Sequence, residues 1–345
     1  MNDLLHEYAR RMPKVELHVH LEGSIRPELL LELACRNKIS LPVNSLDEVK
    51  DFYQFKNFNH FIDVYFTVTS CLHTPEDYTD IAYQYGRECS RQNIRYSEPT
   101  FTMTTNVMYS GLSWKEIIHA LNAGRDKAKR EFGVDWGWII DINRNRPETQ
   151  GEVLDMVRSG REDGILALGL GGDEIGFPPE LFTQTFETAW QENIHRVPHS
   201  GETAGPASIW TSINQLHAER IGHGVRCIED PHLVDVIRIN QIPLEICPTS
   251  NICLGIYTSY EQHPIRKLWD AGLLVTVNSD DPPMFCTDLN HEYEILVDHY
   301  GFNVDDLETA SLNALRASFL PGQEKARIES EFIHEFCRLR EELSL

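Results

Sequence analysis

Two histidines, His18 and His20, lie two residues apart in the stretch PKVELHVHLEGS near the N-terminus. Apolar and polar residues alternate along this stretch, which is the period-two pattern of a β-strand with one apolar face. Side chains at positions i and i+2 leave the same face of a strand, so both imidazole rings can bind one cation. Two surface histidines, or two hydrogen-bonded core histidines, would show the same spacing. Only the rest of the sequence can distinguish a metal site from these two ordinary explanations.

Elements that could position such a pair recur along the whole chain. Short apolar segments predict strands, and helix-like patterns fill most of the intervals between them. Strands that alternate with helices predict βαβ units and a parallel sheet. Eight such units are the count of a (β/α)8 TIM barrel, so we predict an α/β fold of this kind. The expected strands cover residues 14–20, 94–101, 136–142, 165–172, 195–202, 218–224, 243–250 and 274–281, and the clearest helices cover residues 27–39, 113–133, 179–192 and 232–240.

Polar residues stand at nearly every expected strand end. In a barrel the carboxyl ends of the strands converge on one face, where active sites are built. Each residue alone has an ordinary explanation, such as a helix cap, but the coincidence at so many strand ends favours a functional site. The residues are His18 and His20, Glu98, Asp141 and Asn143, Asp173 and Glu174, His199 and Glu202, His223, Ser250 and Asn251, and Asp280 and Asp281.

Four of these residues form a set suited to a metal. His18 and His20 follow the first strand, His199 the fifth and Asp280 the eighth. Three neutral imidazoles and one carboxylate suit zinc and leave room for a water molecule. A catalytic zinc lowers the pKa of bound water to about 7, which makes hydroxide available near neutral pH. The sequence therefore predicts a hydrolase.

Charge and composition exclude several partners. The chain has 31 basic and 53 acidic residues, a formal net charge of −22, so we expect no nucleic-acid or membrane partner. No apolar run is long enough to cross a bilayer, and the charged N-terminus lacks the apolar segment of a signal peptide. The eight cysteines form no CxxC pair, which is typical of reduced thiols in the cytoplasm. No linker divides the chain, so we expect one domain over residues 1–345; its oligomeric state is not fixed by the sequence.

Five motifs occur in order along the chain: HVHLEG, GGDEIGFP, HSGETAGPASIW, AERIGHGVR and NSDDP. In these motifs, and over nearly its whole length, the sequence resembles the adenosine deaminase family of the amidohydrolase superfamily. The resemblance implies a barrel of the metal-dependent hydrolase type with one zinc ion per chain, held by His18, His20, His199 and Asp280. It also implies a reaction in which water replaces the 6-amino group of a purine and ammonia is released.

By the same resemblance, three residues are catalytic. Glu202 matches the carboxyl group that protonates purine N1 and so makes C6 electrophilic. Burial should raise its pKa, because the group has to be protonated when substrate binds. His223 matches the residue that orients and deprotonates the attacking water, and Asp280 shares that task while also touching the metal.

The resemblance also implies four substrate contacts. Gly172 matches a backbone N–H near purine N3, where a side chain would crowd the ring. Asp281 matches an acceptor that faces purine N7. Glu22 stands where adenosine-specific members usually carry Asp, near the ribose 5′-hydroxyl, and His20 is expected to contact the substrate as well as the metal.

The segment FKNFNHFIDVYF, residues 55–66, places Phe58, Phe61, Ile62 and Tyr65 at roughly helical spacing. A helix packed on the barrel would show this pattern. An apolar lid over the site would show it too; this family has such a lid after its first strand, and a lid excludes water. Both interpretations can hold at once.

The substrate within this class stays open. The motifs GGDE and GPASIW favour a nucleoside, so adenosine or 2′-deoxyadenosine is the first expectation, with inosine or 2′-deoxyinosine as product. Glu22 is typical of adenine-specific relatives, and YSEPTFTMTTN departs from the family's usual sequence near the sugar. The alternatives are free adenine and nucleosides with a modified 5′ position, namely methylthioadenosine, S-adenosylhomocysteine and aminodeoxyfutalosine.

Two other classes of protein have to be compared with this one. A binuclear amidohydrolase, such as a lactonase or phosphotriesterase, needs a bridging carboxylate or a carboxylated lysine after the fourth strand. The sequence there is LGGDE, with no lysine. A non-catalytic purine-binding relative would lack some catalytic positions, whereas every position named above is filled.

Overall fold

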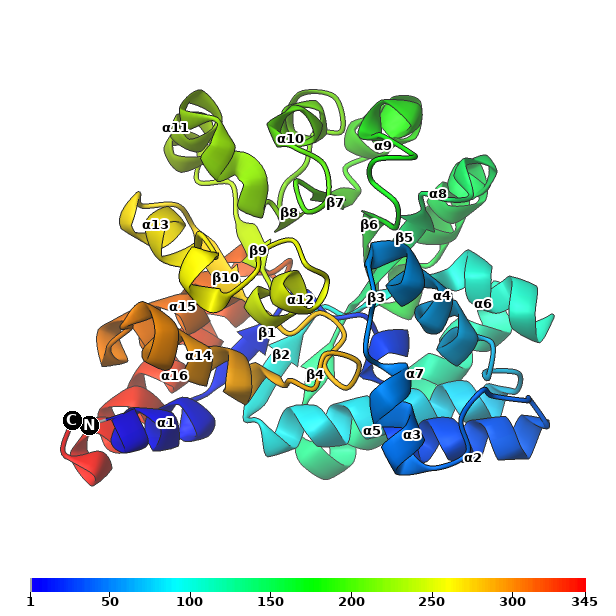
Figure 1. The fold of residues 1–345 in the computed structure, drawn as a ribbon, viewed down its shortest axis with the longest axis horizontal. Coiled ribbons are helices and arrows are strands. Elements are labelled where there is room, and N and C mark those ends of the chain that lie inside the picture. Colours follow the sequence, from blue (N-terminus) through cyan, green and yellow to red (C-terminus); the bar gives the residue numbers. More distant parts are fainter. Residues whose placement is uncertain (1) are drawn as a thin grey trace.

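Ten parallel strands and the helices between them make up the part of the chain that the structure describes, residues 2–345 of a computed structural model (Figure 1). All eight expected strands are present, although several are shorter than their apolar segments. The strands are β1 (Lys14–Glu16), β2 (Ile94–Ser97), β3 (Thr100–Phe101), β4 (Asp135–Trp136), β5 (Trp138–Asn143), β6 (Ile165–Gly171), β7 (His195–Ser200), β8 (Ile221–His223), β9 (Leu244–Ile246) and β10 (Val275–Val277).

Two expected strands are each divided into two pieces. β2 and β3 lie on either side of Pro99, which has no N–H to donate to a sheet. β4 and β5 lie on either side of Gly137, and they pair with different pieces: β4 with β2, and β5 with β3 and β6. The ten pieces are therefore eight strands of a barrel.

The strands pair in a closed ring that ends again at the first strand. Hydrogen-bonded ladders run β1-β2-β4 and β10-β9-β8-β7-β6-β5-β3. Parallel bridges join them just beyond β1, from Val19 to Asp280 and from His20 to Thr100. The predicted (β/α)8 TIM barrel is confirmed, and two of the residues that close it, His20 and Asp280, are expected metal ligands.

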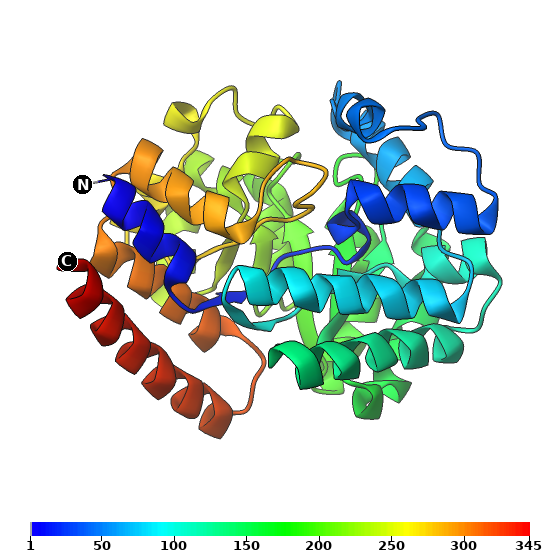
Figure 2. The ribbon, with the colours of Figure 1, turned by 90° about the horizontal axis from the view of Figure 1, so that it is seen from below.

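Helices surround the strands, as both views of the ribbon show (Figures 1 and 2). Proline or a capping side chain starts many of them; Thr74 and Ser113, for example, form capping boxes with the third residue of α5 and α7. The expected helix at 179–192 begins with a 3-10 turn, Pro179–Phe182, before α9. The helices are α1 (Asn2–Arg11), α2 (Pro27–Asn37), α3 (Leu46–Phe52), α4 (Phe58–Thr69), α5 (Pro75–Arg91), α6 (Met103–Ser110), α7 (Trp114–Phe132), α8 (Gln150–Ser159), α9 (Thr183–Gln191), α10 (Pro206–Asn214), α11 (Pro231–Asn240), α12 (Pro248–Cys253), α13 (Ile265–Asp270), α14 (Leu289–Tyr300), α15 (Val304–Ala317) and α16 (Gly322–Leu343).

Both faces of the first strand are buried, which the alternating sequence did not by itself predict. Val15 and Leu17 are fully buried, and so is the acidic side chain of Glu16 between them. In a barrel, one set of alternating residues faces the helices and the other faces the interior. Glu16 accepts hydrogen bonds from the backbone N–H and the hydroxyl of Ser279. The polar face of the strand therefore points into the barrel, where His18 and His20 follow.

The two ends of the chain lie close together on one side of the barrel (Figure 2). Arg11 of α1 forms an ion pair with Glu342 of α16. Among residues 2–345, no helix is long and apolar enough to cross a membrane.

Candidate active site

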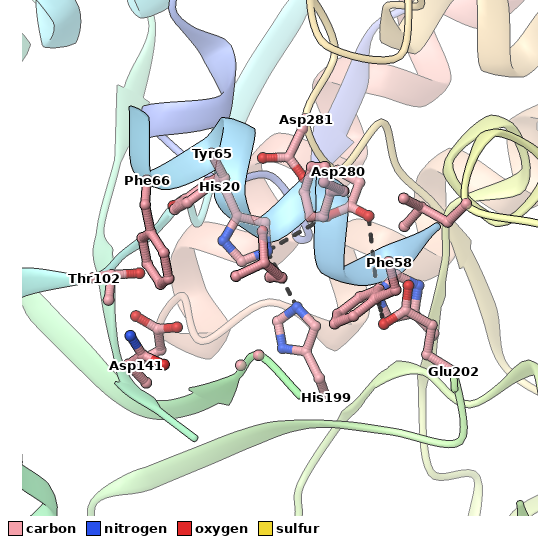
Figure 3. A pocket seen from close by; sticks show the side chains of 17 residues that line it. His20, Phe58, Tyr65, Phe66, Thr102, Asp141, His199, Glu202, Asp280 and Asp281 are labelled. Atoms are coloured by element: carbon pink, nitrogen blue, oxygen red, sulfur yellow. Dashed lines mark hydrogen bonds and ion pairs between the residues drawn. The ribbon is translucent and has the colours of Figure 1, made fainter. Parts of the chain in front are cut away.

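The predicted metal ligands meet at the carboxyl ends of the strands (Figure 3). The Nε2 atoms of His18 and His20 lie 3.5 and 3.4 Å from Oδ1 of Asp280. Nε2 of His20 lies 3.1 Å from Nε2 of His199. The structure thus brings together four residues that span positions 18 to 280 of the sequence.

The donors of this cluster fit a metal ion. Nε2 of His18 is buried and has no hydrogen-bond partner among the described residues. Burial lowers the pKa of His20 to about 4 and that of His199 well below its ordinary value, so both rings are neutral at pH 7, as metal binding requires. His18, His199, His223 and Asp280 offer ligand atoms that all lie within 4.8 Å of one another. Nitrogen and carboxylate donors of this kind suit zinc.

A chain of buried charges fixes the orientation of His18. Its Nδ1 lies 2.9 Å from Oε2 of Glu245, whose Oε1 accepts from Nε of Arg220 at 2.6 Å. Arg220 also donates to Glu98 at 2.6 Å. Because Glu245 accepts the Nδ1 proton, the lone pair of Nε2 is directed into the cluster. The sequence analysis placed Glu98 at a strand end without a role, and Glu245 and Arg220 were missed.

His223 lies between the expected proton donor and the expected metal ligand. Its Nε2 lies 3.7 Å from Oε2 of Glu202 and 3.9 Å from Oδ2 of Asp280. His223 and Asp280 both have left-handed backbone conformations, with φ of 60° and 64°. Such conformations are uncommon for residues other than glycine and concentrate at functional sites. Both side chains are thus directed into the site by strained turns at the ends of β8 and β10.

Asn251 and His263 orient His223 from behind. The amide nitrogen of Asn251 lies 3.4 Å from Nδ1 of His223, and its Oδ1 lies 3.0 Å from Nε2 of His263. The N–H of Ile265 donates to Nδ1 of His263, so the proton of that neutral ring belongs on Nε2. The network therefore assigns Nδ1 of His223 as an acceptor and its Nε2 as the protonated atom that faces Glu202. The sequence contained no local signal for this relay.

Glu202 is buried, and a second glutamate holds its loop. The carboxylate of Glu174 accepts from the backbone N–H groups of Glu202, Thr203 and Ala204 at 2.9 to 3.2 Å. Burial, and next the charge of Asp280, raise the pKa of Glu202 well above its ordinary value. The loop that carries Glu202 is therefore held in place, and the raised pKa favours the protonated form of its carboxyl group.

Gly172 and Asp281 line the same cavity, which has about 540 Å³ of empty space counted to its open mouth. Gly172 has a φ of 105°, and a Cβ there would lie 2.8 Å from Oδ1 of Asn145. Oδ1 of Asp281 is buried without a partner among the described residues. A Cβ at Gly23 would lie 1.7 Å from that oxygen, so Asp281 depends on a glycine in the HVHLEG motif for its position.

The expected lid residues lie on α4 and face the cavity. Phe58, Phe61, Ile62 and Tyr65 all line it, and Phe61 and Tyr65 are buried (Figure 3). Phe61 stacks on Phe285, with ring centroids 5.3 Å apart. The helix therefore packs on the barrel and lines the cavity, and a role as a lid stays a prediction.

Glu22 is buried next to the cavity wall but is not among the residues that line the cavity. Its Oε1 accepts from the N–H of Thr102 at 3.0 Å and from the amide of Asn106 at 2.7 Å. One oxygen of Glu22 is thus held at the start of α6, and the other, Oε2, is buried without a hydrogen-bond partner among the described residues. Thr102 itself lines the cavity, together with Asp141 and Asn143, and the sequence analysis gave none of these three a role.

A parallel barrel with such a cluster at its strand ends defines a hydrolase of the amidohydrolase type. A family model described as adenosine deaminase matches residues 13–335. The chain belongs to the adenosine deaminase family, as its motifs predicted. It is accordingly a deaminase, a hydrolase that acts on C–N bonds.

Similar proteins act on more than one adenine compound. The chain is 38% identical to an aminodeoxyfutalosine deaminase of Streptomyces avermitilis, over 95% of this chain and 92% of that protein. It is 37% identical to an adenine deaminase of Wolinella succinogenes, over 93% and 97% of the two chains. A crystal structure of a Burkholderia ambifaria amidohydrolase with bound zinc superimposes with a TM-score of 0.90 at 25% identity, covering 99% of this chain and 94% of that one.

Proposed function

We propose that this protein hydrolyses the 6-amino group from the adenine ring of a nucleoside with a modified 5′ position, with one zinc ion per chain. The observation that carries the proposal is the arrangement of Glu202, His223 and Asp280 around one end of a lidded cavity. A protonated acid, an oriented imidazole and a carboxylate there meet the needs of hydrolysis at an electron-poor ring carbon.

The protein residues divide the proton transfers between them. Glu202 donates its proton to purine N1, which draws electrons from C6 and prepares it for attack. His223 orients the attacking water through its Nε2–H, and Asp280 accepts the proton of the water, which then passes to the departing amine. A zinc ion held by His18, His20, His199 and Asp280 would supply hydroxide near neutral pH.

Two further residues would hold the purine. The N–H of Gly172 would donate to N3. Asp281 was expected as an acceptor for N7, but N7 is itself an acceptor. Burial, and next the charge of Asp280, raise the pKa of Asp281 well above its ordinary value, so we assign it as the protonated donor to N7.

A 5′-modified nucleoside is a better candidate for the substrate than adenosine. Adenosine was the first expectation from the sequence, but the relatives named above act on aminodeoxyfutalosine or adenine. Phe58, Ile62 and Phe66 also line the cavity, and an apolar wall of this kind suits a substituent larger than a hydroxyl. Free adenine is the second candidate, supported by the Wolinella relative.

A substrate panel tests this proposal. Purified protein with measured metal content would be assayed for ammonia release and for kcat/KM on aminodeoxyfutalosine, methylthioadenosine, S-adenosylhomocysteine, adenosine, 2′-deoxyadenosine and adenine. We expect a 5′-modified nucleoside to give the highest kcat/KM and one metal ion per chain. A higher kcat/KM for adenine would favour the second candidate, and no ammonia from any member would contradict both. Two metal ions per chain would contradict the single-zinc site.

A further inference from the structure

One corner of the cavity is polar and has no part in the deamination described above. Thr102, Asp141 and Asn143 line it, and each side chain is at least nine-tenths buried. Oδ1 of Asp141 has no hydrogen-bond partner among the described residues. A buried acceptor without a partner costs free energy, so a donor from a ligand would satisfy it.

The neighbouring strand makes room for Asp141. Parallel pairing places Asp141 opposite Gly169 and Asn143 opposite Gly171. A Cβ at Gly171 would lie 2.9 Å from Oδ2 of Asp141, and a Cβ at Gly169 would lie 2.9 Å from Cβ of Asp141. Side chains on β6 would therefore displace the carboxylate. The two glycines and the aspartate form one built feature of the barrel wall.

Asp141 lies beyond the metal cluster as seen from Glu202. The Cβ position of Gly171 that approaches Asp141 is also 3.8 Å from Cε1 of His199, so Gly171 separates the two side chains. In Figure 3, Asp141 and Thr102 lie on one side of His199 and Asp280, and Glu202 lies on the other. A purine with N1 at Glu202 and C6 at the cluster would direct its far edge, which carries N9, toward Asp141.

We propose that Asp141 accepts a hydrogen bond from a ribose hydroxyl and so selects nucleosides over the free base. The inference rests on the proposed function, which sets the orientation of the purine. A sugar on N9 offers several hydroxyl donors to a corner lined by three polar side chains. Free adenine offers a single N–H there.

Ligand binding, rather than turnover, tests the inference. Calorimetry would give the Kd of inosine, 2′-deoxyinosine, 3′-deoxyinosine and hypoxanthine for metal-loaded wild type and for Asp141→Asn. We expect wild type to bind inosine about tenfold to a hundredfold more tightly than at least one deoxy analogue, as a hydrogen bond to a charged group predicts. Asp141→Asn should reduce that ratio to within about threefold and leave the Kd of hypoxanthine within about twofold of wild type.

Two more variants complete the test. Gly171→Ala keeps the carboxylate but displaces it, so it should also reduce the ratio. Asp126→Asn makes the same change as Asp141→Asn on the exposed face of α7 and should match wild type.

Several results would overturn the role of Asp141. They are equal wild-type affinity for inosine and both deoxy analogues, a ratio that survives in Asp141→Asn, and failure of wild type to bind any nucleoside. The expected binding pattern without ammonia release from any 6-aminopurine would contradict the proposed function and support the role of Asp141.

Discussion

Nδ1 of His18 lies 2.9 Å from Oε2 of Glu245, and both side chains are buried. The contact joins the first strand of the barrel to β9, across 227 positions of the sequence. It determines which nitrogen of His18 faces the cluster, and Arg220 compensates the charge of Glu245 from the other side. Metal binding is therefore expected to depend on a residue that does not touch the metal.

Glu245→Gln should weaken metal binding about tenfold to a hundredfold, the usual effect of losing such an outer partner. The amide keeps the size of the side chain but withdraws the charge that stabilises Nδ1–H of His18. Competition with a chelator would measure the affinity, with Glu152→Gln on the exposed face of α8 as the control. Equal metal affinity in wild type and Glu245→Gln would show that the contact has no part in metal binding.

Asn251→Asp should lower kcat by roughly tenfold or more while metal content stays at the wild-type level. A carboxylate beside Nδ1 of His223 would draw the ring proton to that atom and remove it from Nε2. Nitrogen NMR of the histidine rings would report the change of tautomer directly. Unchanged kcat together with a changed tautomer would show that the Nε2 proton of His223 has no part in orienting the water.

Gly172→Ala should lower kcat/KM and destabilise the protein by about 1–3 kcal/mol, because the backbone there has a φ of 105°. The added Cβ would also approach Oδ1 of Asn145. Gly151→Ala is the matched control: nothing lies near its Cβ position in α8, so we expect a gain of about 0.5–1 kcal/mol and unchanged activity. Thermal unfolding and steady-state kinetics would measure both effects, and equal behaviour of the two variants would contradict the account of Gly172.

Glu292 is a buried residue of α14, and its carboxyl group should make the stability of the protein depend on pH. Burial raises its pKa from 4.5 to about 7, against hydrogen bonds from Thr249 and Thr287 that lower it. Between these values the folded protein holds a proton that the unfolded chain has lost. The contribution to stability is therefore complete below pH 4.5 and is lost as pH rises to 7.

Glu292→Gln removes this titration. The free energy of unfolding of wild type, relative to that of Glu292→Gln, should fall by up to about 3 kcal/mol as the pH rises from 4.5 to about 7. Urea unfolding of both proteins at several pH values would measure the difference. Parallel pH profiles would mean that Glu292 has an ordinary pKa in the folded protein.

The barrel could be predicted from the sequence because its signals are local. Alternating apolar segments and helix-like intervals mark the strands, and Ser113 and Glu116 mark the start of α7 within four residues. The division of the second strand at Pro99 has a local cause too, although its pairing consequence was not foreseen. What no window of sequence shows is which polar residues become buried partners across the barrel.

The residues of the site also divide into those with a local signal in the sequence and those brought together only by the fold. His18, His20, His199 and Asp280 could be selected because each stands at a strand end, and strand ends share one face of a barrel. The relay from His263 through Asn251 to His223 depends on the fold of the loop after β9. The position of Glu22 in its motif likewise does not reveal that one of its oxygens binds the start of α6.

The central claim is that Glu202 delivers a proton to an adenine ring at a metal site. Comparison of wild type with Glu202→Gln tests it most directly, using the best substrate of the panel and protein with measured metal content. The account predicts an unchanged metal content and a kcat lowered by about a hundredfold to ten-thousandfold, because the amide has the size of the acid but no proton to give. A kcat near that of wild type, with metal bound, would contradict it.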